Sequence, residues 1–283
     1  MGQLLSLKRR RSWGKAGFTV LIALVAAVMV VPLLIMLSGS LKTPGEFAGA
    51  SASLIPEQVY WGNYKSVIGD KFFFRYWYLN SLYVVVTVIA LRLAITVSAA
   101  YAFAKLDFPF KNVLFFVVMG ALMIPTDTTL VGRFLIYRGM GIIDTHLSII
   151  LPAMADVLML FMVRQFFMTL PKELDEAALI DGCGHLQIYT RIVIPLAKPV
   201  IMTVILFTFI WTWNDYTNPS VFISNQQNQL LTVGLTVVSW TERGTVLTRA
   251  LAGAILAIVP TIALFSLTQR FFVQGIAMSG IKG

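Results

Sequence analysis

Side chains that could perform covalent or metal chemistry are scarce in this sequence. It has two histidines, His146 and His185, and a single cysteine, Cys183, so neither an intrachain disulfide nor a multi-cysteine metal site is possible. The H-E-x-x-H and G-x-S-x-G strings of metallopeptidases and serine hydrolases do not occur in it. Its one Gly-Lys pair, Gly14-Lys15, is not followed by Ser or Thr and cannot complete a phosphate-binding loop. We therefore expect no catalytic residue, no metal site and no bound nucleotide in this chain.

Polar and aromatic side chains gather instead near two ends of apolar stretches. Carbohydrates bind aromatic rings through their C–H faces, while amides and carboxylates take their hydroxyls, so such a group suits a sugar. We take as substrate-path candidates Trp211, Trp213, Asn214, Asp215, Tyr216, Asp127 and Arg133. An aromatic belt at the lipid interface would explain the two tryptophans equally well, but it would not explain Asn214 and Asp215.

Two further charges, Arg92 and Asp156, lie inside apolar stretches. A charge at membrane depth is costly unless it is paired or faces a water-filled cavity. The two residues are therefore expected either to form a buried ion pair between helices or to contact the substrate. If Arg92 or Arg133 lay in the path, an acidic or phosphorylated sugar would become more plausible.

The composition shows which elements must position these residues. Of the 283 residues, 58% are hydrophobic and 12% are charged, against about 25% charged in soluble domains. Apolar blocks of this length predict transmembrane helices, since about 20 apolar residues span a bilayer. The fold class is therefore an all-α integral membrane protein, a single transmembrane domain over residues 1–283. Its six spans are expected at about residues 16–37, 79–104, 113–136, 147–163, 199–216 and 250–269.

Six spans place both termini on the same side of the membrane. The segments on that side carry most of the Lys and Arg residues, including the basic run at 8–11. Because basic residues near helix ends stay in the cytoplasm, we expect an N-in/C-in topology in which loop 164–198 is cytoplasmic. Loops 38–78 and 217–249 are then extracytoplasmic. The net charge of +9 is thus a topology signal and requires no nucleic acid.

The cytoplasmic loop has its own helix signals. Pro171 and the acidic residues after it suit a helix N-terminus, and Gly182 suits the left-handed turn that ends a helix. We expect a helix-turn-helix folded at Gly182, with a second helix over 186–192 that ends before Pro195. Ala177, Ala178 and Ile180 are expected on an exposed edge. An amphipathic helix lying on the membrane surface is the alternative.

This loop resembles a known motif. Glu176-Ala177-Ala178, then Gly182 and Ile192-x-Ile194-Pro195, is similar to the EAA loop of permeases of binding-protein-dependent ABC importers. At average residue frequencies, six such matches have a chance probability of about 10⁻⁷ per start position. Ile194 stands where the pattern has Leu, which is a conservative departure.

Strings along most of the chain narrow the resemblance to MalG-type carbohydrate permeases. They include Met123-Ile-Pro125, Gly141-Ile-Ile-Asp144-Thr145, Trp213-Asn214-Asp215-Tyr216, Leu231-Thr-Val-Gly234-Leu235 and Gln269-Arg-Phe-Phe-Val-Gln-Gly275. Arg92 and Arg133 depart from the family, which tends to be uncharged at such positions.

The resemblance implies a transport complex. It implies that the EAA loop is a coupling helix seated on an ATP-hydrolysing subunit, and that the importer works by alternating access. The residues it assigns to ATPase coupling are Glu176, Ala177, Ala178, Asp181, Gly182, Ile192 and Pro195. The candidates for contact with the binding protein are Asn225, Gln226, Gln227 and Asn228, although a solvated connector would show the same polar residues.

The implied partners are a second, homologous permease, two ATP-binding cassette subunits, an extracytoplasmic solute-binding protein and a sugar, in the cytoplasmic (inner) membrane of a bacterium or archaeon. Mg-ATP would be bound by the partner ATPase and not by this chain. The alternatives are an ABC permease for an acidic or phosphorylated sugar, an amino acid or an osmolyte, and, from other classes, an ion-coupled secondary transporter or a membrane-embedded enzyme.

Overall fold

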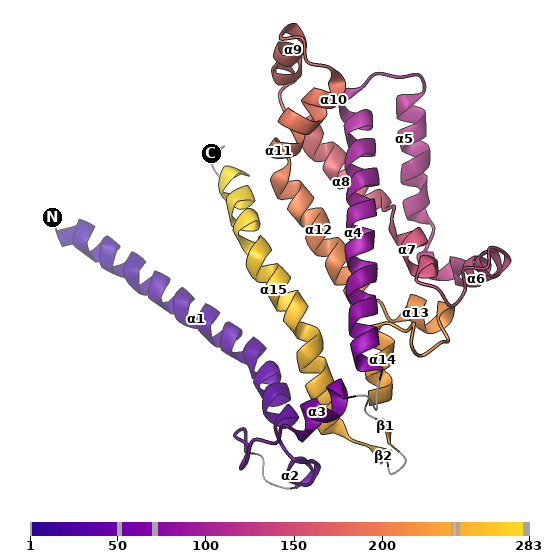
Figure 1. Ribbon diagram of the computed structural model, residues 1–283. Coiled ribbons are helices and arrows are strands. Elements are labelled where there is room, and N and C mark those ends of the chain that lie inside the picture. Colours follow the sequence, from indigo (N-terminus) through magenta and orange to yellow (C-terminus); the bar gives the residue numbers. More distant parts are fainter. Residues whose placement is uncertain (1, 50–52, 70–72, 239, 242–243, 280–283) are drawn as a thin grey trace. The chain divides into compact units, whose positions relative to one another are not determined.

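The computed structural model describes residues 2–49, 53–69, 73–238, 240–241 and 244–279 (Figure 1). The chain divides into two compact units. One comprises Met1–Phe72 with Leu235–Leu256, and the other comprises Phe73–Gly234 with Ala257–Gly283. The expected single domain over 1–283 stays a prediction, and the expected loops 38–78 and 217–249 lie partly outside the described residues.

The first unit combines N-terminal helices with the segment around a short β-ladder. Its elements are α1 (Gly2–Ser40), α2 (Pro44–Ala48), α3 (Gly62–Ile68), the antiparallel strands β1 (Trp240–Thr241) and β2 (Gly244–Thr245), and the first turns of α15 (Leu247–Ser279). The buried amide of Asn63 donates to the carbonyls of Ser40 and Lys42, both at 2.8 Å. Its oxygen accepts from the hydroxyl of Thr248 at 3.1 Å. Because buried amides are costly unless bonded, Asn63 fixes the end of α1 against α3 and the start of α15.

The second unit holds the predicted functional residues. Its elements are α4 (Phe74–Lys105), α5 (Lys111–Gly120), η1 (Ala121–Met123), η2 (Thr126–Thr129), α6 (Leu130–Gly139), α7 (Leu147–Ala153), α8 (Val157–Met168), α9 (Lys172–Ile180), α10 (His185–Ile188), the π-helical turn η3 (Tyr189–Val193), α11 (Ile194–Leu196), α12 (Lys198–Trp213), α13 (Thr217–Phe222), the first turn of α14 (Leu231–Val238) and the remainder of α15. Apart from the two-residue strands, all regular secondary structure in the described residues is helical, which confirms the all-α prediction.

Four helical segments are long and apolar enough to cross a membrane among the described residues. They are Phe18–Ser40, Phe74–Lys105, Leu147–Met168 and Leu247–Gln269. Two further pairs qualify only as bent spans: Lys111–Met123 with Thr126–Gly139, at 86°, and His185–Leu196 with Lys198–Trp213, at 76°. The structure thus has four to six candidate spans. The count of six and the N-in/C-in topology stay predictions.

Three expected spans differ from the structure. The stretch 113–136 is not one straight helix, because Pro125 has no N–H to donate and adopts an extended ψ of 126°. The span 147–163 continues to Met168 and is interrupted at residues 154–156. The span 199–216 ends earlier, at Trp213, so α12 has 16 residues and is about 24 Å long.

The second helix of the loop over residues 164–198 also continues further than expected. It does not end before Pro195 but runs through α10, η3 and α11 to Leu196. Within η3 the N–H of Ile194 bonds to the carbonyl of Tyr189, five residues back. This π-type turn widens the helix directly before Pro195, where the ring would otherwise crowd the preceding turn.

The helix α4 organises the second unit. It packs against α8 and α12, and its buried residues recur every three or four positions, as expected for a helix with one buried face: Phe74, Trp77, Ser81, Val84, Val85, Val88, Arg92, Thr96, Val97, Ala100 and Tyr101. Val84 and Val88 belong to one apolar core, whereas Val97 and Ala100 belong to another. Arg92 lies between the two cores, where a charge is least expected from helix periodicity.

Candidate functional site

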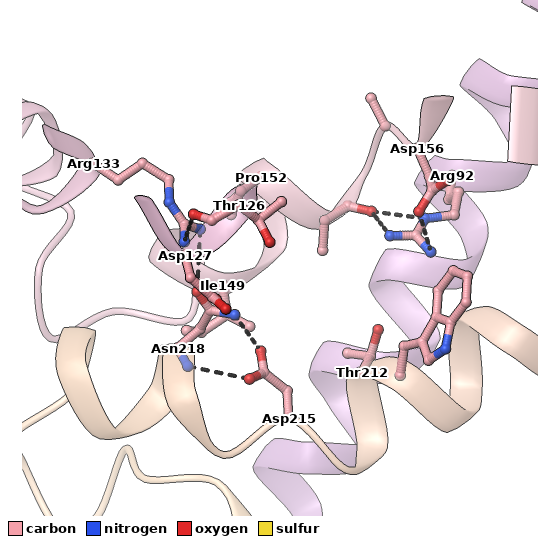
Figure 2. A pocket seen from close by; sticks show the side chains of 13 residues that line it. Arg92, Thr126, Asp127, Arg133, Ile149, Pro152, Asp156, Thr212, Asp215 and Asn218 are labelled. Atoms are coloured by element: carbon pink, nitrogen blue, oxygen red, sulfur yellow. Dashed lines mark hydrogen bonds and ion pairs between the residues drawn. The ribbon is translucent and has the colours of Figure 1, made fainter. Parts of the chain in front are cut away.

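A polar cavity of about 360 Å³ lies in the second unit. Its walls come from α4, η2, α6, α7, the α7–α8 junction, α12, the turn after α12 and α13. The lining residues are Arg92, Thr126, Asp127, Arg133, Ile149, Pro152, Ala153, Ala155, Asp156, Trp211, Thr212, Asp215 and Asn218. Figure 2 shows two separate groups of polar side chains on opposite sides of this space, one around Arg92 and the other around Arg133.

Protein groups surround the guanidinium of Arg92. Nε and Nη2 both donate to the carbonyl of Ala153, at 2.8 and 2.5 Å, and Nη1 donates to the hydroxyl of Thr208 at 3.2 Å. Nη1 also lies 3.6 Å from a carboxylate oxygen of Asp156. The predicted buried ion pair between Arg92 and Asp156 is therefore confirmed.

This ion pair caps both helix ends at the interruption after Pro152. Ala153 is the last residue of α7, and its carbonyl, which has no helical partner at such an end, accepts from Arg92. Asp156 precedes α8 and accepts from the backbone N–H of Met159 at 2.9 Å. A cation at a helix C-terminus and an anion at a helix N-terminus both complement the helix dipole. The pair thus stabilises broken backbone that an apolar environment would not otherwise tolerate.

The opposite wall is a chain of hydrogen bonds from Arg133 to Asp215. Nη1 of Arg133 donates to Oδ1 of Asn218 at 3.1 Å, and Nδ2 of Asn218 donates to Oδ2 of Asp215 at 2.8 Å. The backbone N–H of Asn218 also donates to Asp215, at 3.1 Å. The guanidinium carbon of Arg133 lies 5.6 Å from the ring centre of Phe222. Donors and acceptors are therefore held in fixed positions at this wall.

The cavity brings together four of the seven substrate-path candidates. Trp211, Asp127, Arg133 and Asp215 all line it, and Trp211 leaves 43% of its surface exposed. They lie in two stretches far apart in sequence, residues 127–133 and 211–215, so the fold brings them together.

The other three candidates lie outside the lining. Trp213 is buried; its Nε1 donates to the carbonyl of Ala257 at 3.0 Å and its ring stacks on Phe209. Asn214 donates to the carbonyl of Ile210 one turn back, at 2.8 Å. Tyr216 is half exposed and is not among the lining residues. This cavity therefore does not include all seven candidates, and the place of these three in the substrate path stays a prediction.

The predicted turn at Gly182 has the expected geometry. Gly182 adopts φ +80°, its N–H donates to Leu179 at 3.0 Å, and the N–H of Cys183 donates to Ala178 at 2.9 Å. This pair of bonds is the Schellman arrangement, which satisfies the last carbonyls of α9.

The side chains of α9 divide between the two sides of that helix. Ile180 is 87% exposed, and Glu176, Ala177 and Asp181 are also exposed. The expectation that Ala178 is exposed was wrong, because it packs into the core with α4, α8 and α12 and is only 6% exposed. Ile192 is half-buried and Pro195 is exposed.

The predicted binding-protein segment, residues 225–228, is held by its backbone. The carboxylate of Asp144 accepts from the N–H groups of Ser224 and Asn225, at 2.5 and 3.0 Å, and from the Ser224 hydroxyl at 2.9 Å. The carbonyl of Asp144 accepts from Nδ2 of Asn228 at 3.0 Å. Asp144 itself adopts φ 63°, a conformation that Asp tolerates better than most residues. These bonds leave the side chains of residues 225–227 exposed.

Sequence reasoning missed Thr212, Asn218 and the role of Asp144. Asn218 lies three residues after Asp215, a spacing that brings two side chains together within one turn and could have indicated the contact. Asp144 follows Gly141 by three residues, and both have positive φ. No sequence signal points to Thr212, whose place in the lining depends on how α12 packs.

Asp144 gives a prediction about stability and pH. The N–H groups of Asn225 and Ser224 lower the pKa of Asp144 below its ordinary value, so its contribution to stability is present at neutral pH and is lost as the pH falls through that lowered pKa. We expect Asp144→Asn to lower the thermal unfolding midpoint of the purified chain in detergent. The difference in unfolding midpoint between this variant and the wild type should stay constant down to about pH 4 and should disappear below that pH.

The matched control is Asp107→Asn, since the Asp107 side chain is fully exposed in its ion pair with Lys111. It should leave the midpoint unchanged. A gap between wild type and Asp144→Asn that widens in acid would contradict this account.

Comparisons with known proteins place this geometry in a family. Residues 1–278 match the model of the binding-protein-dependent transport system inner membrane component family. The chain is 30% identical to the arabinooligosaccharides transport system permease protein AraQ of Halalkalibacterium halodurans, over 94% of this chain and 95% of that protein. It is 31% identical to the osmoprotective compounds uptake permease protein GgtD of a Synechocystis species, over 97% and 95%.

A solved structure shares the fold. The crystal structure of a bacterial ABC transporter involved in the import of the acidic polysaccharide alginate contains a chain that aligns with a TM-score of 0.81 and 24% identity, over 93% of this chain and 97% of that one. The family match covers nearly the whole sequence, and the helices are those of a multi-pass membrane protein. The chain therefore belongs to the binding-protein-dependent transport system inner membrane component family.

Proposed function

We propose that this chain is the permease subunit of an ATP-driven importer of sugars or oligosaccharides that works by alternating access. The observation that carries the proposal is the cavity: a space of about 360 Å³ with fixed donors, fixed acceptors and the exposed face of Trp211, in an otherwise apolar helical unit. Polar groups at membrane depth mark the path of a solute. One relative is named as a permease for arabinooligosaccharides, which agrees with a sugar as the substrate.

The charged residues that line the cavity favour an uncharged solute. The cation of Arg92 is paired with Asp156, which leaves Arg133 together with Asp127 and Asp215 in the lining. A site with more carboxylates than free cations would repel an acidic ligand. We therefore prefer a neutral polyhydroxylated substrate to an acidic or phosphorylated sugar. The cavity resembles sugar-binding sites in combining an aromatic ring with hydroxyl-binding groups.

The loop comprising residues 169–197, which we call the docking loop, is the proposed contact with an ATP-binding cassette subunit. Its exposed Ile180 and the small side chain of Ala177 offer an edge that another surface can approach closely. Mg-ATP would bind to that partner. A second homologous permease would complete the membrane domain, and a solute-binding protein would approach residues 225–228 from outside. This arrangement requires six spans, both termini in the cytoplasm and a bacterial or archaeal inner membrane.

The cavity assignment predicts different effects for two adjacent residues. Asp215→Ala removes an acceptor from the lining, whereas Asn214→Ala removes a side chain that bonds to its own helix. In proteoliposomes with the partner subunits and the cognate binding protein, we expect uptake of labelled arabinotriose or maltotriose at limiting concentration to fall about tenfold or more for Asp215→Ala. Asn214→Ala should transport as wild type does. Equal uptake by both variants would argue against a sugar contact in this cavity.

The docking loop offers an equally close comparison between two glycines. Gly182 and Gly184 both have open space where a Cβ would stand, but only Gly182 has a positive φ. Gly182→Ala therefore strains the turn by about 1–2 kcal/mol, and Gly184→Ala does not. We expect co-purification of the ATPase subunit to drop for Gly182→Ala alone. Wild-type retention by Gly182→Ala would contradict docking through this turn.

A further inference from the structure

One helix, α4, is bonded to all three regions to which a transport function is proposed here. Each contact lies within the second unit and joins α4 to a segment far away in sequence. The outer segment 224–231 meets its first turns, the cavity meets its middle, and the docking loop meets its last turns. Figure 1 shows α9 beyond one end of α4, with α10 beside that end.

At the first turns, side chains of α4 hold the backbone of the outer segment. Nε1 of Trp77 donates to the carbonyl of Gln226 at 2.6 Å. Nδ2 of Asn80 donates to the carbonyls of Gln227 and Gln229, at 2.7 and 3.1 Å. Bonds to backbone atoms fix the segment whatever its side chains contact.

At the last turns, α4 bonds to the docking loop. Nζ of Lys105 lies 2.7 Å from Oδ2 of Asp175 in α9, and it donates to the carbonyl of Leu170 at 3.1 Å. The hydroxyl of Tyr101 donates to the carbonyl of His185, at the start of α10, at 3.2 Å. The side chain of Lys105 is only 8% exposed and that of Asp175 is 21% exposed. A pair so shielded from water keeps most of its electrostatic attraction and is costly to separate.

Between these two ends, the sequence of α4 favours a straight, rigid helix. Its 32 residues include neither Pro nor Gly, the usual causes of helix kinks. By contrast, α1 contains Pro32 and α15 contains Pro260. From Trp77 to Lys105 the helix rises about 42 Å, which is about the full thickness of a bilayer with its headgroups. From Arg92 to Lys105 the rise is about 20 Å.

We propose that α4 transmits movement of the docking loop to the cavity, and that Lys105 is the positioning residue through which it does so, by its contacts with Asp175 and Leu170. Apolar contacts hold the docking loop as well, since Ala178 and Ile188 are in the same core as α4. Docking and transmission therefore depend on different groups. The inference rests on the proposed function, because it requires an ATPase at the docking loop.

The test measures whether ATP changes access to the cavity. In a Cys183→Ser chain, Thr126→Cys places one thiol in the cavity lining, and its labelling by a water-soluble maleimide is followed in the reconstituted complex, with and without ATP and vanadate. Lys105→Met removes the charge and keeps the side-chain size, and Lys105→Arg keeps the charge. The matched control, Lys111→Met, breaks an ion pair with Asp107 that spans only four residues and is exposed on one side.

With Lys105 intact, we expect nucleotide to change the labelling rate by about fivefold or more. With Lys105→Met, the ATPase subunit should still co-purify and hydrolyse ATP, but the nucleotide effect on labelling should be lost. Lys105→Arg and Lys111→Met should keep it.

A nucleotide effect that survives Lys105→Met would overturn the inference, and so would loss of the ATPase subunit from that variant, because Lys105 would then serve docking. Absence of any nucleotide effect with Lys105 intact would instead contradict the proposed function.

Discussion

The burial of one guanidinium group in an apolar helical unit is the constraint on which the rest of the structure depends. Arg92 stands on α4 between two apolar cores, where an unpaired charge would not be tolerated. It is accommodated because the helical segment Leu147–Met168 is interrupted beside it, between α7 and α8. The interruption exposes the carbonyl of Ala153 and the carboxylate of Asp156. The buried charge and the helix interruption are interdependent. The guanidinium of Arg92 bonds to the groups exposed at the interruption, and these groups in turn neutralise and bond the guanidinium.

The cavity follows from the same arrangement. Irregular backbone at membrane depth is tolerated where it is buried in protein or lines a polar cavity, and the α7–α8 junction lines the cavity described above. The η2 segment and the turn after α12 line it as well. Since Arg92 is paired with Asp156 on its own side, we assign contact with a solute to groups on the opposite wall, Arg133, Asp127 and Asp215. The cavity thus has a structural ion pair on one side and the proposed solute-contacting groups on the other.

Much of this arrangement could be predicted from the sequence where the signal is local. Gly182 requires a left-handed turn because of its place after α9, and Arg92 and Asp156 had to find partners because both lie in apolar stretches. The errors arise where tertiary packing decides. Ala178 looked exposed on its helix but packs into a core with α4, α8 and α12. Trp213 was grouped with Trp211, although residues two apart on a helix point in different directions. Pro195 did not end its helix, because a π-type turn made room for it.

A double-mutant cycle on Arg92 and Asp156 tests the central claim most directly, with the thermal unfolding of the purified chain as the readout. Arg92→Leu leaves the carboxylate of Asp156 and the carbonyl of Ala153 without their cationic partner, so the chain should lose about 3–5 kcal/mol of stability. Adding Asp156→Leu to that variant should recover part of the loss, so that the two substitutions are not additive. An Arg92→Leu chain that unfolds at the wild-type temperature but no longer transports would contradict the claim, because Arg92 would then serve the solute and not the fold.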